Sequence, residues 1–158
     1  MPVTFRDAAP LLTAILMLAS VPALAQVAAI QSQDTNIAGV AADIVEAKRS
    51  DGVLSVRVRV KNTGAKTAKV RIYHTYYGFK VDSYYVQAEG KKYFVLRDTE
   101  KAPLAAMGNM ENQFEPDVGP GSTFTWWAKY PAPPTNVKKF NFNWPLGAPF
   151  DDVPITDK

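Results

Sequence analysis

Residues 53–61 (VLSVRVRVK) alternate between apolar and polar side chains, and this pattern constrains the fold more than any other feature of the chain. A helix would scatter the two sets of side chains around its surface, whereas a half-buried strand separates them onto two faces. The predicted buried face holds Leu54, Val56, Val58 and Val60, and the opposite face holds Ser55, Arg57, Arg59 and Lys61. The segment Asn62-Thr63-Gly64 suits the turn that ends this strand.

Other segments show the same period. Strands are predicted over 67–77, over 84–87 and 92–97 as a hairpin with Glu89-Gly90 in its turn, over 122–130 and over 137–143. Residues 98–121 are either a long loop or two weak strands, and the Pro-rich tail from Trp144 is expected to clasp the body as an extended segment. The Ala-rich segment 37–48 is open to either a helix or a strand, and its all-β surroundings favour the strand.

About seven short strands with turn signals between them predict a single all-β sandwich. With 158 residues, a second domain would have no room for its own core.

Part of the sequence resembles a known group of domains. The stretch GVLSVRVRVKNTG (52–64) is similar to the strand-and-turn signature of exported bacterial immunoglobulin-like domains. YFVLRD (93–98), STFTWWAKYPAPP (122–134) after Gly-Pro-Gly, and PFDDVPI (149–155) also resemble uncharacterised immunoglobulin-like domains of bacterial envelope proteins. The resemblance spans about residues 37–155 and implies an immunoglobulin-like β-sandwich that binds or scaffolds. It brings no catalytic residues.

The first 25 residues have the pattern of a signal peptide. Arg6 precedes the apolar run LLTAILMLA (11–19), and Ala23-Leu24-Ala25 supplies a small-residue cleavage site. The run is too short to cross a hydrocarbon core about 30 Å thick. We therefore expect a signal peptide over 1–25, a short polar lead-in over 26–36 and the sandwich over 37–158, in the periplasm or secreted, with no transmembrane segment after cleavage.

Composition and motifs exclude several classes of function. The chain has no cysteine, so thiol catalysis and thiolate metal sites are absent. The sequence contains no G-x-S-x-G, S-x-x-K or H-E-x-x-H pattern. A net charge of +3 is too small for a nucleic-acid-binding polycation and slightly favours anionic partners. We expect a non-catalytic binding or accessory module without a cofactor, whose partner is an envelope protein or a glycan; the oligomeric state stays open.

Aromatic and basic side chains are the candidate contact residues. Adjacent residues on a strand face opposite ways, so one of Trp126 and Trp127 belongs to the core, and we expect Trp127 to lie outside. The predicted aromatic surface is Trp127 with Tyr76, Tyr77, Tyr84 and Tyr85, unless loops or the tail cover it. A basic patch combines Arg57, Arg59 and Lys61 with Lys69 and Arg71 if their strands are neighbours, and splits if they are not.

An alternative reading is a small metal-handling protein. Met107 and Met110 could supply soft thioether ligands for copper, and His74 is the only histidine. Two methionines and one distant histidine are few ligands, so we favour loop packing for these methionines.

Overall fold

The computed structural model describes residues 27–74, 80–107 and 113–158. Its strands are β1 (Gln31–Asp34), β2 (Val40–Ser50), β3 (Val53–Asn62), β4 (Ala68–Lys69), β5 (Tyr73–His74), β6 (Tyr85–Ala88), β7 (Lys91–Tyr93), β8 (Gln113–Phe114), β9 (Asp117–Val118), β10 (Thr123–Pro131), β11 (Lys139–Asn143), β12 (Phe150–Pro154) and β13 (Thr156–Asp157). A single 3₁₀ turn, η2 (Val81–Ser83), precedes β6 in the described chain. The predicted signal peptide lies outside these residues.

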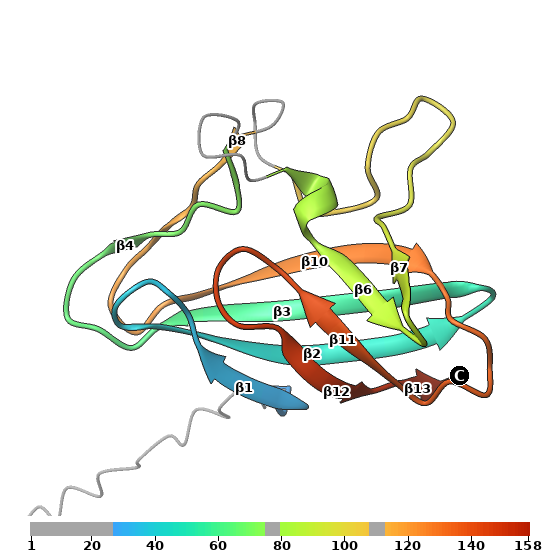
Figure 1. The fold of residues 1–158 in the computed structure, drawn as a ribbon. Coiled ribbons are helices and arrows are strands. Elements are labelled where there is room, and N and C mark those ends of the chain that lie inside the picture. Colours follow the sequence, from blue (N-terminus) through green and yellow to red (C-terminus); the bar gives the residue numbers. More distant parts are fainter. Residues whose placement is uncertain (1–26, 75–79, 108–112) are drawn as a thin grey trace, which may run out of the picture.

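Two sheets pack face to face (Figure 1). The five-stranded sheet has the order β1-β2-β3-β10, with β13 also paired to β2. The four-stranded sheet has the order β12-β11-β6-β7 and passes in front of β2, β3 and β10 in this view. The small pairs β4-β9 and β5-β8 extend one end. This arrangement confirms the predicted all-β sandwich.

The central strands follow the alternation of the sequence. β3 buries Leu54, Val56, Val58 and Val60 completely, and β10 pairs with it in antiparallel register along its whole length. The segment 37–48, which the sequence left open to a helix or a strand, lies for the most part in the strand β2. Asp51 and Gly52 join β2 to β3 with positive φ at both residues, and Glu89 and Gly90 do the same between β6 and β7. Paired positive φ values are the geometry of tight hairpin turns, as predicted for Glu89-Gly90.

A β-bulge at Val45 reverses the phase of β2. Before it, Ile44 pairs with Val58; after it, Glu46 pairs with Arg57. Val40, Ala42 and Ile44 therefore face the core from even positions, whereas Ala47 and Arg49 face inward from odd positions. A regular strand would have turned Glu46 into the core and Arg49 out to solvent.

Aromatic rings connect the two sheets across the core. Trp126 of β10 lies 4.9 Å from Tyr84 and 5.8 Å from Phe142 of β11, measured between ring centroids. Phe142 continues to Phe150 of β12 at 6.4 Å. Such tilted pairs contribute about 1 kcal/mol each beyond the area they bury. In a chain with no disulfide, these contacts hold the sandwich closed.

Two predicted segments differ from the structure. The polar lead-in includes β1, an edge strand whose Gln and Ser side chains tolerate solvent. The predicted strand over 67–77 is interrupted in its described part: β4 and β5 are separate two-residue strands. Their partner segment contains Pro116, which has no N–H to donate to the ladder. The tail forms β12 and β13, as the clasp prediction requires.

Arg49 anchors the end of the sandwich. Its side chain is only 6% exposed, and its Nε donates to Asp157 Oδ1 of β13 at 2.6 Å. The remaining guanidinium hydrogens bond the carbonyl oxygens of Pro133, Pro134, Thr135 and Val137 at 2.6–3.2 Å. Lys138 Nζ also donates to Asp157, at 3.0 Å. A single buried cation thus joins β2, the Pro-rich loop and β13, and we call this group of contacts the Arg49 clasp.

Replacing Arg49 should destabilise the fold strongly. We expect Arg49→Ala to lower the free energy of unfolding by about 3 kcal/mol, because it leaves buried carbonyl groups without donors. Urea titration followed by circular dichroism measures this change. Arg57→Ala is the matched control: Arg57 is 56% exposed, and its loss should cost less than about 1 kcal/mol. Equal losses in the two variants would contradict this account of the clasp.

The clasp should also weaken in acid. Hydrogen bonds from Arg49 and Lys138 lower the pKa of Asp157 from 3.8 to about 2. Because the folded pKa lies below the unfolded value, the stabilisation is complete above about pH 4 and is lost as the pH falls toward 2. We expect the stability difference between the protein and its Asp157→Asn variant to shrink over this window, as followed by urea titrations at several pH values. A constant difference across that range would exclude this assignment.

Candidate functional site

The outer face of the five-stranded sheet presents Trp127. Trp126 is 1% exposed in the core and Trp127 is 39% exposed, so the predicted division of the two tryptophans is confirmed. In the strand register, Trp127 lies beside Arg57, which lies beside Glu46. The next row consists of Lys129, Ser55 and Lys48. We call these six residues the Trp127 face.

The Trp127 face is open and polar around its ring. Arg57 Nε lies 3.7 Å from Glu46 Oε1, and both side chains remain partly exposed. A shallow hollow of about 50 Å³ lies among Glu46, Arg57, Trp127 and Lys129. This volume is too small to enclose a small molecule, so a partner would bind on the surface of this face and not inside a pocket.

Arg59 and Lys61 belong to a different group on the same outer face. Arg59 Nη2 lies 2.7 Å from Asp43 Oδ2, and Lys61 Nζ lies 3.1 Å from Asp43 Oδ1. Arg59 also donates to the carbonyl of Val27 at 2.8 Å. Burial raises the pKa of Asp43, but hydrogen bonds from Ser32, Arg59 and Lys61 outweigh it and hold the pKa below its usual value. These two cations stabilise the sheet, and Arg59 is only 13% exposed.

The wider basic patch splits, one of the two outcomes left open by the sequence. Lys69 and Arg71 do not lie beside β3, because their segment pairs with 114–118. Arg71 Nε lies 3.0 Å from Glu115 Oε1, and Lys69 Nζ lies 3.8 Å from Asp117 Oδ1. Among the predicted basic contact residues on β3, Arg57 is the most exposed.

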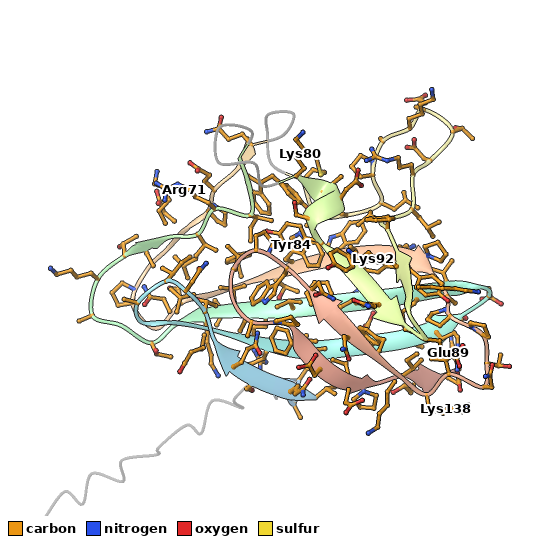
Figure 2. The ribbon with its side chains drawn as sticks, viewed as in Figure 1. Arg71, Lys80, Tyr84, Glu89, Lys92 and Lys138 are labelled. Atoms are coloured by element: carbon orange, nitrogen blue, oxygen red, sulfur yellow. The ribbon has the colours of Figure 1, made fainter. Side chains whose placement is uncertain are left out.

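The predicted aromatic surface is also divided. The placement of Tyr84 on it is wrong: this side chain is fully buried, its ring packs on Trp126, and its hydroxyl donates to the carbonyl of Ile72 at 2.5 Å (Figure 2). Tyr85 faces outward from β6, with Lys92 Nζ 4.4 Å from its ring centroid and Phe94 at 6.0 Å. It therefore belongs to the outer face of the other sheet, opposite Trp127.

Some predicted residues lie outside the described part of the structure. These are Tyr76, Tyr77, Met110 and the side chain of His74. Met107 is described and is 38% exposed. Within 27–74, 80–107 and 113–158, no three His, Asp or Glu side chains form a metal-binding group. The copper hypothesis stays a prediction.

Alternation in the sequence places Lys129 on the same side of its strand as Trp127, and the structure confirms this. Sequence reasoning missed Glu46 and Lys48 as neighbours of Trp127, since the bulge at Val45 decides which way they point.

The comparisons with known proteins identify no relative. No protein-family model, curated protein or solved structure matches the chain. In the described segments, no helix has the length and apolar character needed to span a membrane. The resemblance to exported immunoglobulin-like domains remains an expectation from the sequence.

Replacement by phenylalanine should destabilise the protein at Trp126 and have little effect at Trp127. We expect Trp126→Phe to lower the free energy of unfolding by about 2 kcal/mol, because it removes packing and the 2.8 Å hydrogen bond from Trp126 Nε1 to Tyr73 Oη. Trp127→Phe should change stability by less than about 0.5 kcal/mol. Urea titration of both variants makes the comparison, and a larger loss in Trp127→Phe would show that this ring is part of the core.

Proposed function

We propose that this chain is an exported, non-catalytic binding or accessory module that contacts a glycan of the bacterial envelope through the Trp127 face. The observation that carries the proposal is a tryptophan 39% exposed in the middle of a regular strand, in one row with Arg57 and Glu46. Leaving such a ring in water forgoes its burial, so an exposed aromatic among polar groups is a typical contact residue.

The chemistry of the face fits a sugar. An indole ring offers a flat apolar surface to the C–H face of a pyranose, while the carboxylate and guanidinium beside it can bond the ring hydroxyls. Lys48, Arg57 and Lys129 outnumber the single carboxylate of this face, Glu46. Charge complementarity therefore favours an acidic glycan over a neutral one.

The face is held rigidly. Trp127 lies in β10, which pairs with β3 on one side. On the other side the amide of Ala106 donates to the carbonyl of Trp127 at 2.8 Å, and the amide of Lys129 donates to the carbonyl of Leu104 at 2.9 Å. A side chain on a backbone bonded along both edges loses little freedom when a partner binds, so a weakly enclosing surface can still bind.

Binding to defined polymers tests the proposal. We expect retention on immobilised polygalacturonate that falls as salt rises, with weaker retention on neutral dextran. Trp127→Ala should weaken binding at least tenfold, a loss of about 1.4 kcal/mol typical of a central contact residue. Arg57→Ala should weaken binding and flatten the salt dependence.

Phe94→Ala is the matched control. Phe94 is 47% exposed, but it lies beside Tyr85 near the other sheet, so its removal should leave retention unchanged. Retention that survives in Trp127→Ala would exclude the Trp127 face as the contact surface. No retention on either polymer, together with Trp127-dependent binding to a purified envelope protein, would replace the glycan by a protein partner.

A further inference from the structure

A second site candidate lies at the end of the sandwich where η2 and the segment 97–103 rise above β10 (Figure 1). Between them is an open cavity of about 570 Å³, within the range of about 300–1,000 Å³ of small-molecule sites. It is far larger than the hollow beside Trp127. The described residues that line it are Tyr73, Lys80, Val81, Asp82, Arg97, Glu100, Lys101, Ala102, Pro103 and Met107.

The wall formed by 97–103 is a closed turn rather than a loose loop. Asp98 Oδ1 accepts from the amides of Glu100 and Ala102, each at 2.9 Å. The amide of Asp98 in turn donates to the carbonyl of Ala102 at 2.9 Å. Lys101 has a φ of 65°, a conformation that is costly for a residue other than Gly, Asn or Asp. These bonds hold the Lys101 backbone in this conformation at the cavity.

The charges of the described lining residues do not cancel. Arg97 Nη2 pairs with Asp82 Oδ1 at 3.2 Å, and Arg97 Nη1 donates to the carbonyl of Lys101 at 3.2 Å. Lys80 and Lys101 pair with no carboxylate in the part of the chain that the structure describes (Figure 2 labels Lys80 beside η2). Glu100 is the remaining acid among the described lining residues, which together carry an excess of one positive charge.

The rest of the lining is apolar. Val81, Ala102, Pro103 and Met107 line the cavity together with Tyr73, which is 1% exposed. The Tyr73 hydroxyl accepts the indole N–H of Trp126 at 2.8 Å, which connects this cavity to the core. A compact apolar group could pack against these walls, and a single anionic group could pair with the ammonium groups of the two lysines.

We propose that this cavity binds an amphiphilic monoanion, that is, a small apolar body carrying one carboxylate or similar anionic group. Lys80 and Lys101 receive the anionic group, and the apolar walls contact the body, with Tyr73 beside them. The site is separate from the Trp127 face, so it stands or falls independently of the glycan proposal.

Octanoate is the probe, with octanol as its uncharged counterpart. The chain has three tryptophans, and their indole N–H signals in a ¹H–¹⁵N NMR spectrum report on three places. Trp126 bonds Tyr73 at the cavity, Trp127 lies on the outer face, and Trp144 bonds the carbonyl of Ala148. We expect octanoate to shift the Trp126 signal saturably and to leave the other two in place, and octanol to bind at least fivefold more weakly.

The double variant Lys80→Gln, Lys101→Gln keeps the side-chain length and removes the charge. It should weaken octanoate binding at least tenfold, while Lys91→Gln, at an exposed edge strand, should leave it unchanged. The proposal is overturned if Trp126 does not shift, if octanol binds as well as octanoate, or if the double variant binds like Lys91→Gln. A shift of the Trp127 signal alone would show that octanoate binds at the outer face, and this result would also overturn the proposal.

Discussion

One additional residue in β2 determines which side chains of this strand point into the core and which point to the outer face. The bulge at Val45 changes which positions of β2 face the core. Upstream, β2 contributes Val40, Ala42 and Ile44 to the core. Downstream, the same strand sends Arg49 inward and Glu46 outward. The Arg49 clasp and the Trp127 face, on opposite sides of one sheet, therefore depend on the same local shift of register.

The clasp shows how a buried cation can be accommodated without a buried anion. Arg49 is almost enclosed, yet its carboxylate partner Asp157 is 46% exposed, and most of its hydrogen bonds go to carbonyl groups of residues 133–137. Prolines at 131, 133 and 134 leave this loop with few amide donors, so an external donor is needed to satisfy its carbonyls. The guanidinium supplies several donors from a single side chain.

Alternation predicted the strands whose partners are regular and failed where pairing is irregular. It located β3, β10 and the β6–β7 hairpin, and the rule that separated Trp126 from Trp127 could equally have separated Tyr84 from Tyr85. It could not show that Lys69 and Arg71 lie apart from β3, because that depends on pairing with residues more than forty positions away. The inward direction of Arg49 was equally hidden: a bulge leaves no composition signal, and an arginine in a strand reads as solvent-facing.

The pairing of β13 with β2 has a consequence for how the chain folds. β1, which is close to β2 in the sequence, pairs with the first part of the β2 edge that β3 leaves free. The later part of that edge, at Lys48 and Arg49, pairs with Thr156 and Asp157 of β13. The partners Arg49 and Asp157 are 108 positions apart in the chain. Closing so long a loop is slow compared with forming a hairpin. For that interval the backbone groups at this end of β2 are unpaired and can bond a strand of another molecule, so the yield of correctly folded protein depends on concentration.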